Sequence, residues 1–412
     1  MVRSLAAGIR SGLPGREEGD RWLLLLTLLL VGAGLAMVLS ASTALAYAQY
    51  HFALYYFLRQ LAFAGMGTVA LLVLRRVDYH RYAPWAPALA ALAAVAMLAT
   101  LVPGIGLRIN GASRWLNLGP LGQFQPSEAG KLAFTLFLAS WVDRRRDRLQ
   151  SLGDGFLPFL VLLAGALGLL MLERDLGSAL VMGAIFVSVY FTGGGRKRHL
   201  ALALLALLVV FLLLVLLEGY RVQRINVFLH PFKDPLGTGF QSSQALIGLG
   251  SGGLTGVGLG QSVEKYFWLP EADTDFIFAI IGEETGLVGT TLVLLAFVIL
   301  AVRGYRIALR APDRFGVMVA AAITTWVSFQ AMLNMGTVTD TLPITGVPLP
   351  FISYGGTALA ITMAAMGILL NVAAQGERQS RAHRRTDAAV DLGRRDWRAP
   401  LASARRRPGV PR

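Results

Sequence analysis

Three carboxylates lie in one short run of the chain, Leu269-Pro-Glu-Ala-Asp-Thr-Asp-Phe276. A carboxylate here, before a long apolar segment, can act as a general base that removes a proton from an attacking hydroxyl group. Thr274 is a suitable N-cap for a helix, and it would place Asp275 in the first turn, where the helix dipole stabilises a carboxylate. From residue type and position, catalysis and helix-end stabilisation are about equally favoured for Asp275. Glu271 and Asp273 compete for the same role.

The segments that must position these residues are long and apolar. Of the 412 residues, 55% are hydrophobic and only 15% are charged, whereas soluble domains carry about 25% charged residues. Apolar runs of about 18 or more residues can cross a membrane as helices, and so many of them cannot fit around one soluble core. We therefore predict an all-α, polytopic membrane protein with ten spans, at residues 22–43, 56–75, 84–102, 127–142, 156–172, 177–193, 199–217, 275–302, 315–337 and 351–374.

The basic residues between the spans predict the orientation. Arginine and lysine cluster after spans two, four, six and eight, and the loops after spans one and nine contain neither. Because cytoplasmic loops carry the excess of Lys and Arg, both termini should be cytoplasmic. The predicted parts are a cytoplasmic N-terminal segment (1–21), a transmembrane domain (22–375) with a large extracytoplasmic loop between helices 7 and 8 (218–274), and a cytoplasmic tail (376–412).

The tail is strongly basic, with eleven arginines against four acidic residues. We predict that it is disordered, with contact to anionic lipid or a partner as the alternative. It carries no nucleic-acid recognition motif, so no nucleic-acid partner is expected. The chain has no cysteine, which excludes disulfides, thiolate metal sites and cysteine nucleophiles.

The predicted outward loops hold arginines that the positive-inside bias does not favour, including Arg108 and Arg114. They indicate an anionic ligand at the outer surface. Inside the spans, Glu128 and Lys131 are three residues apart and can pair on one helix face. A salt bridge between helices and a role in a cavity are equally favoured for this pair. For Glu283 and Glu284 a structural role is favoured, because their depth would keep them from a substrate at the surface.

Several longer motifs resemble those of the SEDS family (shape, elongation, division and sporulation), the polytopic peptidoglycan glycosyltransferases. The likeness covers residues 20–375. It rests on Arg114-Trp-Leu-Asn-Leu-Gly119, Gln125-Pro-Ser-Glu128 with Lys131, Asp175-Leu-Gly-Ser-Ala179, Asp234-Pro-Leu-Gly237 with Gln241 and Gln244, Gly250-Ser-Gly-Gly253, Leu269-Pro-Glu271, Thr274-Asp-Phe-Ile-Phe-Ala279, Gly282-Glu-Glu284 and Pro348-Leu-Pro-Phe-Ile-Ser-Tyr-Gly-Gly356.

The resemblance implies polymerisation of lipid II at the outer face of the bacterial cytoplasmic (inner) membrane, by an inverting reaction. The family's essential acidic residue matches Asp275, which would be the base. Residues expected to bind substrate or line the cavity are Arg108, Arg114, Glu128, Lys131, Asp175, Lys233, Gln244, Glu271 and Ser353. A divalent cation such as Mg²⁺ or Mn²⁺ is an alternative source of positive charge, although no ligand spacing predicts a metal site and no cofactor is certain.

The resemblance also implies partners. These are a class B penicillin-binding transpeptidase and other membrane proteins of the divisome or elongasome. Within the family, the stretch Gly258-Leu-Gly-Gln-Ser-Val-Glu-Lys265 favours the division type. Many relatives carry His where this chain has Asp273, whose carboxylate could raise the pKa of Asp275 by like-charge repulsion or bind a cation.

Two other functions fit a membrane protein of this kind. A lipid II flippase or transporter would share the spans and the intramembrane charges. Against it stand the lack of an inverted repeat, the lack of a span broken at the midplane, and the position of the motifs on one face. A non-catalytic division scaffold would leave the outward arginines and acids unexplained.

Overall fold

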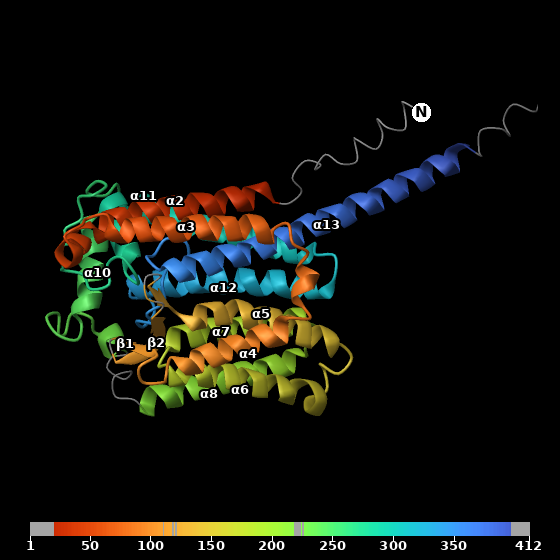
Figure 1. Ribbon diagram of the computed structural model, residues 1–412, viewed down its shortest axis with the longest axis horizontal. Helices are drawn as coiled ribbons and strands as arrows, with labels where there is room; N and C mark the ends of the chain where they lie inside the picture. Colours follow the sequence, from red (N-terminus) through yellow and green to blue (C-terminus); the bar gives the residue numbers. More distant parts are fainter. Residues whose placement is uncertain are drawn as a thin grey trace, which may run out of the picture.

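The protein is a bundle of membrane-type helices, seen here in a computed structural model that describes residues 20–109, 111–117, 119, 122–217, 224 and 226–396 (Figure 1). Its helices are α2 (Arg21–Tyr50), α3 (Tyr55–Leu74), α4 (Ala86–Ala99), α5 (Pro126–Arg144), α6 (Leu157–Leu172), α7 (Leu176–Thr192), α8 (Lys197–Leu217), α10 (Phe240–Ser251), α11 (Ile277–Leu309), α12 (Arg314–Val338) and α13 (Gly356–Asp396), with short helical turns η1 (Tyr79–Tyr82) and η3 (Leu152–Phe156).

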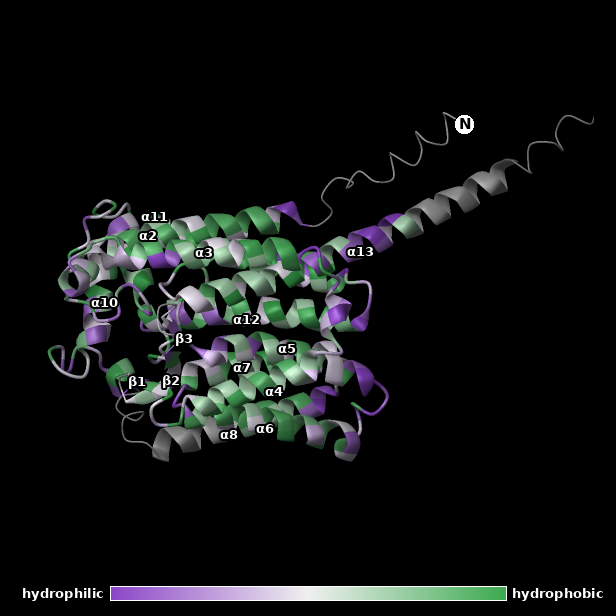
Figure 2. Ribbon diagram, in the orientation of Figure 1, coloured by the Kyte–Doolittle hydropathy of each residue, from purple (hydrophilic) through white to green (hydrophobic). Residues whose placement is uncertain are grey.

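The helices match the predicted spans. Each described helix except α10 overlaps one predicted range, and six described helices are both long and apolar enough to cross a membrane. In Figure 2, apolar residues follow the length of the helices and polar residues gather at the ends of the bundle. The chain is a helical, multi-pass membrane protein, and the number of spans remains a prediction.

The two ends of the bundle differ. One end, called the loop end below, carries α10 and a small antiparallel sheet of β1 (Gly106–Ile109), β2 (Ala112–Asn117) and β3 (Gln123–Phe124). This sheet was not predicted. Its first turn contains Gly111 at φ 78°, a left-handed conformation that glycine adopts without strain. The other end, called the tail end, is where α13 leaves the bundle (Figure 1).

Helix α12 is the centre of the bundle, in contact with α5, α7, α11 and α13. Its large side chains, such as Trp326 and Met318, are fully buried. By contrast, α2, α3 and α11 leave many leucines and valines exposed on one side, as expected for helices that face lipid. Polar groups on α12 are therefore enclosed by protein, where they can position other elements.

Helix α11 is broken at Gly286, which has φ 65° and ψ −162°. The break leaves backbone carbonyl and amide groups without partners inside the helix, and residues 253–258 form hydrogen bonds with them. The amides of Val257 and Gly258 donate to the carbonyls of Glu283 and Glu284, at 2.9 and 3.1 Å, and Leu287 N donates to a carbonyl in the same segment. Helix α11 is therefore a broken helix, whereas the prediction was that no span is broken at the midplane. The break lies in the first third of α11, near the loop end, and not at its middle.

Gly286→Ala is expected to destabilise the protein by about 2–4 kcal/mol. Only glycine readily adopts this backbone conformation, and an added Cβ would lie 2.4 Å from the Gly256 nitrogen, which forces the two segments apart. The measurement is the thermal unfolding midpoint in detergent. Gly165→Ala in α6 is the control, because its Cβ meets no atom within 4 Å, and it should be neutral or stabilising by about 0.5–1 kcal/mol. Equal midpoints for the two variants would contradict the expectation.

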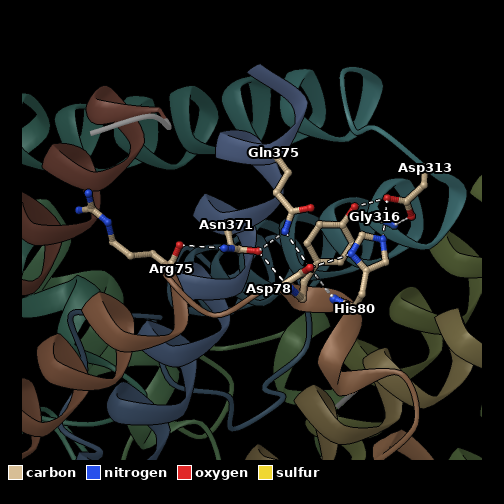
Figure 3. A network of polar contacts seen from close by, with 8 residues as sticks. Arg75, Asp78, His80, Asp313, Gly316, Asn371 and Gln375 are labelled. Atoms are coloured by element: carbon tan, nitrogen blue, oxygen red, sulfur yellow. Dashed lines mark hydrogen bonds and ion pairs between the residues drawn. The ribbon is translucent and has the colours of Figure 1, made fainter. Parts of the chain in front are cut away.

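At the tail end, a polar network ties the α3–α4 connection to α12 and α13 (Figure 3). Asp313 caps α12 by accepting from Gly316 N at 2.9 Å, and it also accepts from the Tyr79 hydroxyl and from His80 Nε2. His80 Nδ1 lies 2.7 Å from Asp78. Because one imidazole contacts both carboxylates, the network holds three parts of the chain in one arrangement.

Helix α13 completes this network. Asn371 accepts from Tyr79 N at 3.1 Å and donates to the Arg75 carbonyl at 2.9 Å, and Gln375 donates to Asp78 at 2.8 Å. A polar cavity of about 450 Å³ lies beside these residues. It is at the end of the bundle opposite to the acidic run of residues 269–276.

Beyond the bundle, α13 continues as a helix to Asp396. The prediction of a disordered tail from residue 376 is therefore wrong for residues 376–396. Residues 397–412, and most of the predicted N-terminal segment, lie outside the described residues.

Candidate active site

Asp275 lies in the turn that leads into α11 at the loop end. The helix begins at Ile277 with Phe276 as its N-cap residue, and the Thr274 hydroxyl bonds to Glu271. The predictions that Thr274 caps the helix and that Asp275 lies in its first turn are therefore wrong. Asp275 is partly buried, it directly precedes the N-cap residue Phe276, and α11 has no side-chain capping hydrogen bond, so capping of α11 does not explain the carboxylate.

The turn is held in place from two sides. Asn334 on α12 donates its Nδ2 to the Asp275 carbonyl at 2.7 Å and to the Val347 carbonyl at 2.8 Å. The Ser353 hydroxyl donates to the Thr274 carbonyl at 2.6 Å. Glu271 adopts φ 56°, and its carbonyl accepts from Phe276 N at 3.1 Å. The backbone of Asp275 is thus fixed by protein groups, which leaves its side chain for chemistry.

The environment of Asp275 tunes it for proton transfer near neutral pH. Burial, followed by the nearby Glu271 carboxylate, raises the pKa of Asp275 to about 7; Asp175 adds to this, and Arg114 and Arg224 oppose it. The like charges that act on Asp275 are Glu271 and Asp175, and not Asp273 as predicted. A carboxylate with a pKa near the working pH is well suited to act as a general base.

Asp273 differs from Asp275 in its burial and in the charges that act on it. It is buried, and burial raises its pKa to about 6, with a smaller contribution from Glu271. Its carbonyl accepts from Tyr354 N at 2.8 Å. Glu271 is exposed and accepts from the Thr274 hydroxyl at 2.8 Å. Arg114 and Arg224 act electrostatically on Asp275, and neither is among the charges that shift the pKa of Asp273.

The opposite wall of the site is formed by Asp175 and Arg114. Asp175 caps α7 by accepting from Ser178 N at 3.0 Å, and it accepts from Gln125 Nε2 at 3.2 Å. Its Oδ1 atom lies 3.9 Å from Arg114 Nη1. Strand β2 carries Arg114, whose Nε donates to the Glu173 carbonyl at 3.4 Å. The unpredicted sheet is therefore what brings Arg114 to α7.

Glu173 lies behind this wall and is fully buried. Burial and the charge of Asp175 raise its pKa to about 8. One of its oxygens accepts from the Thr100 hydroxyl at 3.1 Å, and the other has no partner among the described residues. At neutral pH this carboxyl is mainly protonated and can donate a hydrogen bond.

The remaining predicted basic residues separate into two groups. Arg224 donates to the Ile344 carbonyl at 2.7 Å, and its charge acts on Asp275. Arg108 on β1 and Lys233 after α8 are exposed side chains, and the structure does not bring them to Asp275.

The predicted Glu128–Lys131 pair is confirmed, with 2.7 Å between Lys131 Nζ and Glu128 Oε1 and both side chains buried. Lys131 also donates to Gln330 Oε1 at 2.7 Å and lies over the Trp326 ring. Gln330 Nε2 donates in turn to the Pro348 carbonyl at 2.9 Å. The pair therefore reaches the loop beside Asp275 through α12.

Gln330 and Asn334 are site residues that the sequence analysis missed. Their spacing was the available signal, because polar amides four residues apart share one face of a helix. Polar side chains inside a span face protein or a cavity, since lipid cannot satisfy them. Both amides bind the segment of residues 347–348, and Asn334 also binds Asp275.

Asn334→Leu is expected to lower the free energy of unfolding by about 1–3 kcal/mol, because it leaves two buried carbonyls without a donor. The thermal midpoint of the purified protein measures this effect. Met332→Leu on the same helix is the control, because Met332 is exposed and surface substitutions stay within about 0.5 kcal/mol. An unchanged midpoint for Asn334→Leu would show that this amide does not hold the turn.

Gln244 belongs to a separate polar cluster beside the break in α11. Its amide nitrogen, in the orientation that satisfies both partners, donates to the Glu264 carboxylate. Burial and the charge of Glu283 raise the pKa of Glu264 to about 7. Glu283 accepts from Val263 N at 2.8 Å and from the Ser262 hydroxyl. Glu284 pairs with Lys265 at 3.1 Å. These contacts are compatible with the structural role predicted for Glu283 and Glu284, which stays a prediction.

Metal binding was considered for the site. Across the described part of the chain, no three acidic or histidine side chains converge as a metal-binding group. Mg²⁺ commonly uses one or two carboxylates together with substrate phosphates. A cation at this site would therefore take most of its oxygen ligands from a phosphate-containing substrate.

Comparison with known proteins gives one consistent result. Residues 21–378 match the family model of FtsW, RodA and SpoVE, described as "Cell cycle protein". The chain is 42% identical to stage V sporulation protein E of Bacillus subtilis (strain 168), covering 87% of this chain and 97% of that protein. It is 41% identical to the probable peptidoglycan glycosyltransferase FtsW of Geobacter metallireducens, covering 86% and 95%.

Solved structures agree. A chain of a peptidoglycan synthase complex, described as coordinating polymerization and crosslinking, aligns with a TM-score of 0.72 and 29% identity, covering 87% of this chain and 98% of that one. The rod shape determining protein RodA of Thermus thermophilus aligns with a TM-score of 0.63 and 28% identity, covering 88% and 98%. With its helical bundle and the motifs that converge at the loop end, the chain belongs to the FtsW/RodA/SpoVE family.

Proposed function

We propose that this protein is a peptidoglycan glycosyltransferase that polymerises lipid II into glycan strands at the outer face of the cytoplasmic membrane, in cell division or elongation. The observation that carries the proposal is the position of Asp275 at the loop end, a partly buried carboxylate with a pKa of about 7 on which the charges of Arg114 and Arg224 act. The relatives named peptidoglycan glycosyltransferase FtsW support the same reaction.

The loop end is assigned to the outer face because basic residues are concentrated at the other end. Arg75, Arg76, Arg303 and Arg314 lie beside the tail end, and loops rich in arginine stay in the cytoplasm. Both termini are then cytoplasmic, since α2 begins and α13 leaves the bundle at that end. Asp275 would meet a lipid-linked sugar on the outer side.

In the proposed reaction, an acceptor sugar hydroxyl attacks the anomeric carbon of a donor. Asp275 takes the hydroxyl proton as the new carbon–oxygen bond forms. The bond from the anomeric carbon to the pyrophosphate breaks, and undecaprenyl pyrophosphate leaves. Attack from the opposite side inverts an α-linkage to β. Arg114 and Arg224 would stabilise the charge on the leaving pyrophosphate, while Glu128, Lys131 and Asp175 support the walls that position it.

The proposed partners follow from the products. A glycan strand needs crosslinking, and a structural neighbour is part of a complex described as coordinating the two steps. We therefore propose a class B penicillin-binding transpeptidase as the partner, together with other membrane proteins of the division or elongation machinery. The division role is favoured by the stretch from Gly258 to Lys265.

The test is an assay of the purified protein with lipid II in sealed vesicles, alone and with the transpeptidase. Glycan polymer on the side of the loop end supports the proposal. Lipid II that crosses the bilayer without being polymerised would favour the transporter, although the break in α11 lies near the loop end and not at the midplane, where transporters bind their substrates. If the protein neither polymerises lipid II nor moves it across the bilayer, the non-catalytic scaffold is the remaining function.

A further inference from the structure

Four tyrosines from three parts of the chain meet at the loop end. Tyr50 ends α2, Tyr55 and Tyr56 begin α3, and Tyr354 precedes α13. Tyr50 and Tyr55 are stacked, with ring centroids 3.8 Å apart and an angle of 16° between the planes. Tyr56 meets Tyr50 edge-to-face at 5.9 Å and Tyr354 at 5.0 Å. We call these four residues the tyrosine cluster.

The tyrosine cluster is fixed to the segment that carries Asp275. Tyr354 N donates to the Asp273 carbonyl at 2.8 Å, two residues before Asp275. Gln60, one turn after Tyr56, is buried and donates to the Ser353 carbonyl at 3.0 Å, while its Oε1 accepts from Gly355 N at 3.2 Å. The rings are therefore held at a set position relative to the candidate base.

The cluster is also linked to the opposite wall of the site. The Arg59 guanidinium lies 5.7 Å from the centre of the Tyr55 ring and donates to its hydroxyl at 3.4 Å. The same guanidinium packs against Gly122, where an added Cβ would lie 1.6 Å from Arg59 Nη2. Gly122 precedes β3 of the sheet that carries Arg114. The rings thus extend from α2 toward the sheet, along the edge of the site.

The tyrosine cluster is partly open to solvent. Tyr50 is 47% exposed, although its ring stacks on another ring. A buried core would have enclosed these side chains, so packing alone does not explain them. Flat rings with polar hydroxyls suit a ligand with an apolar face and a polar rim. A pyranose ring has this character, because its axial C–H groups form a face and its hydroxyl and acetamido groups form the rim.

From this arrangement we propose that the tyrosine cluster is a saccharide-binding subsite, which holds a sugar of the glycan strand next to the two reacting units. The proposal rests on the proposed function and adds a residue set that determines how the strand is retained. A sugar C–H face would lie against the exposed part of Tyr50, which is 47% exposed. Burial raises the pKa of the Tyr354 hydroxyl to about 12, so this hydroxyl remains protonated and can donate a hydrogen bond to the sugar.

The competing explanation is general anchoring, because tyrosines gather at membrane–water boundaries. Tyr47 provides the matched control. It lies one turn before Tyr50 on α2 and is 63% exposed, and its ring meets His51 and not the cluster. Anchoring predicts the same effect at both positions, whereas a saccharide subsite predicts an effect at Tyr50 only.

The experiment uses the full-length protein with its transpeptidase and compares Tyr50→Leu, Tyr50→Phe and Tyr47→Leu. Strand length is measured on lipid II, and binding is measured for a soluble tetrasaccharide of alternating N-acetylglucosamine and N-acetylmuramic acid. We expect Tyr50→Leu to bind the tetrasaccharide about tenfold more weakly and to make shorter strands, because it loses one ring contact. Tyr50→Phe, which keeps the ring, and Tyr47→Leu should match the wild type.

Three results would overturn the proposal. These are equal losses in Tyr50→Leu and Tyr47→Leu, wild-type strand length and binding in Tyr50→Leu, and no tetrasaccharide binding to the wild type at millimolar concentration. The binding of the tetrasaccharide is measured on the wild-type protein, so this test does not depend on whether a variant folds. A wild-type protein that makes no polymer would contradict the proposed function. An active Tyr50→Leu variant with unchanged strand length would contradict only the saccharide-binding subsite.

Discussion

Asp275→Asn is expected to lower the rate of glycan polymerisation by about 10²- to 10⁴-fold, the usual contribution of a general base. Asparagine has nearly the same size and cannot accept the proton. The backbone carbonyl that Asn334 binds is unchanged by the substitution, so the fold should be retained. The initial rate of polymer formation from lipid II measures the effect, and the thermal midpoint checks the fold.

The neighbouring acids are the controls for this prediction. Asp273→Asn and Glu271→Gln should each keep more than a tenth of the activity. Glu271→Gln should also lower the pKa of Asp275, because the Glu271 carboxylate helps to raise it. If Asp275→Asn polymerises normally while one of the other two variants is inactive, the base has been assigned to the wrong residue.

Lys131→Met is expected to destabilise the protein by about 3–5 kcal/mol, because it leaves Glu128 buried without its partner. Both side chains are at most 1% exposed, and one oxygen of Glu128 already lacks a partner among the described residues. The expected result is a large fall in the thermal midpoint and in the yield of folded protein. The double variant Lys131→Met with Glu128→Gln removes both charges and should recover most of the midpoint.

The double variant also separates two roles for Lys131. Its contacts with Gln330 and Trp326 make it a positioning residue that acts through α12. In that case the refolded double variant should keep its KM for lipid II and lose part of its kcat. A raised KM at unchanged kcat would instead indicate that Lys131 binds the substrate directly.

Much of the fold could be predicted from the sequence because the apolar runs are long. A run such as residues 22–43 can only be stable as a helix in lipid, and the helix α2 follows. Short elements carry no comparable signal. The sheet at residues 106–124 has strands of two to six residues, and the break at Gly286 depends on a contact with residues 253–258 that is distant in sequence.

The candidate site shows the same division. The Glu128–Lys131 pair followed from helical spacing, and it is present. The meeting of Arg114, Asp175 and Asp275 joins three separate loops, and residue spacing could not predict it; only the family resemblance did. The Lys265–Glu284 pair and the contact between Asn334 and Asp275 were missed, because each depends on how a loop folds back onto a helix.

The most direct measurement is the pH dependence of lipid II polymerisation by the purified wild-type protein. A base must be deprotonated to act, so kcat/KM should fall as the pH drops through the raised pKa of Asp275, about 7. We predict a plateau above pH 8, a midpoint near 7 and about a tenfold decrease for each unit below pH 6. No polymer at any pH, or a rate that stays constant from pH 5 to 9, would contradict the account.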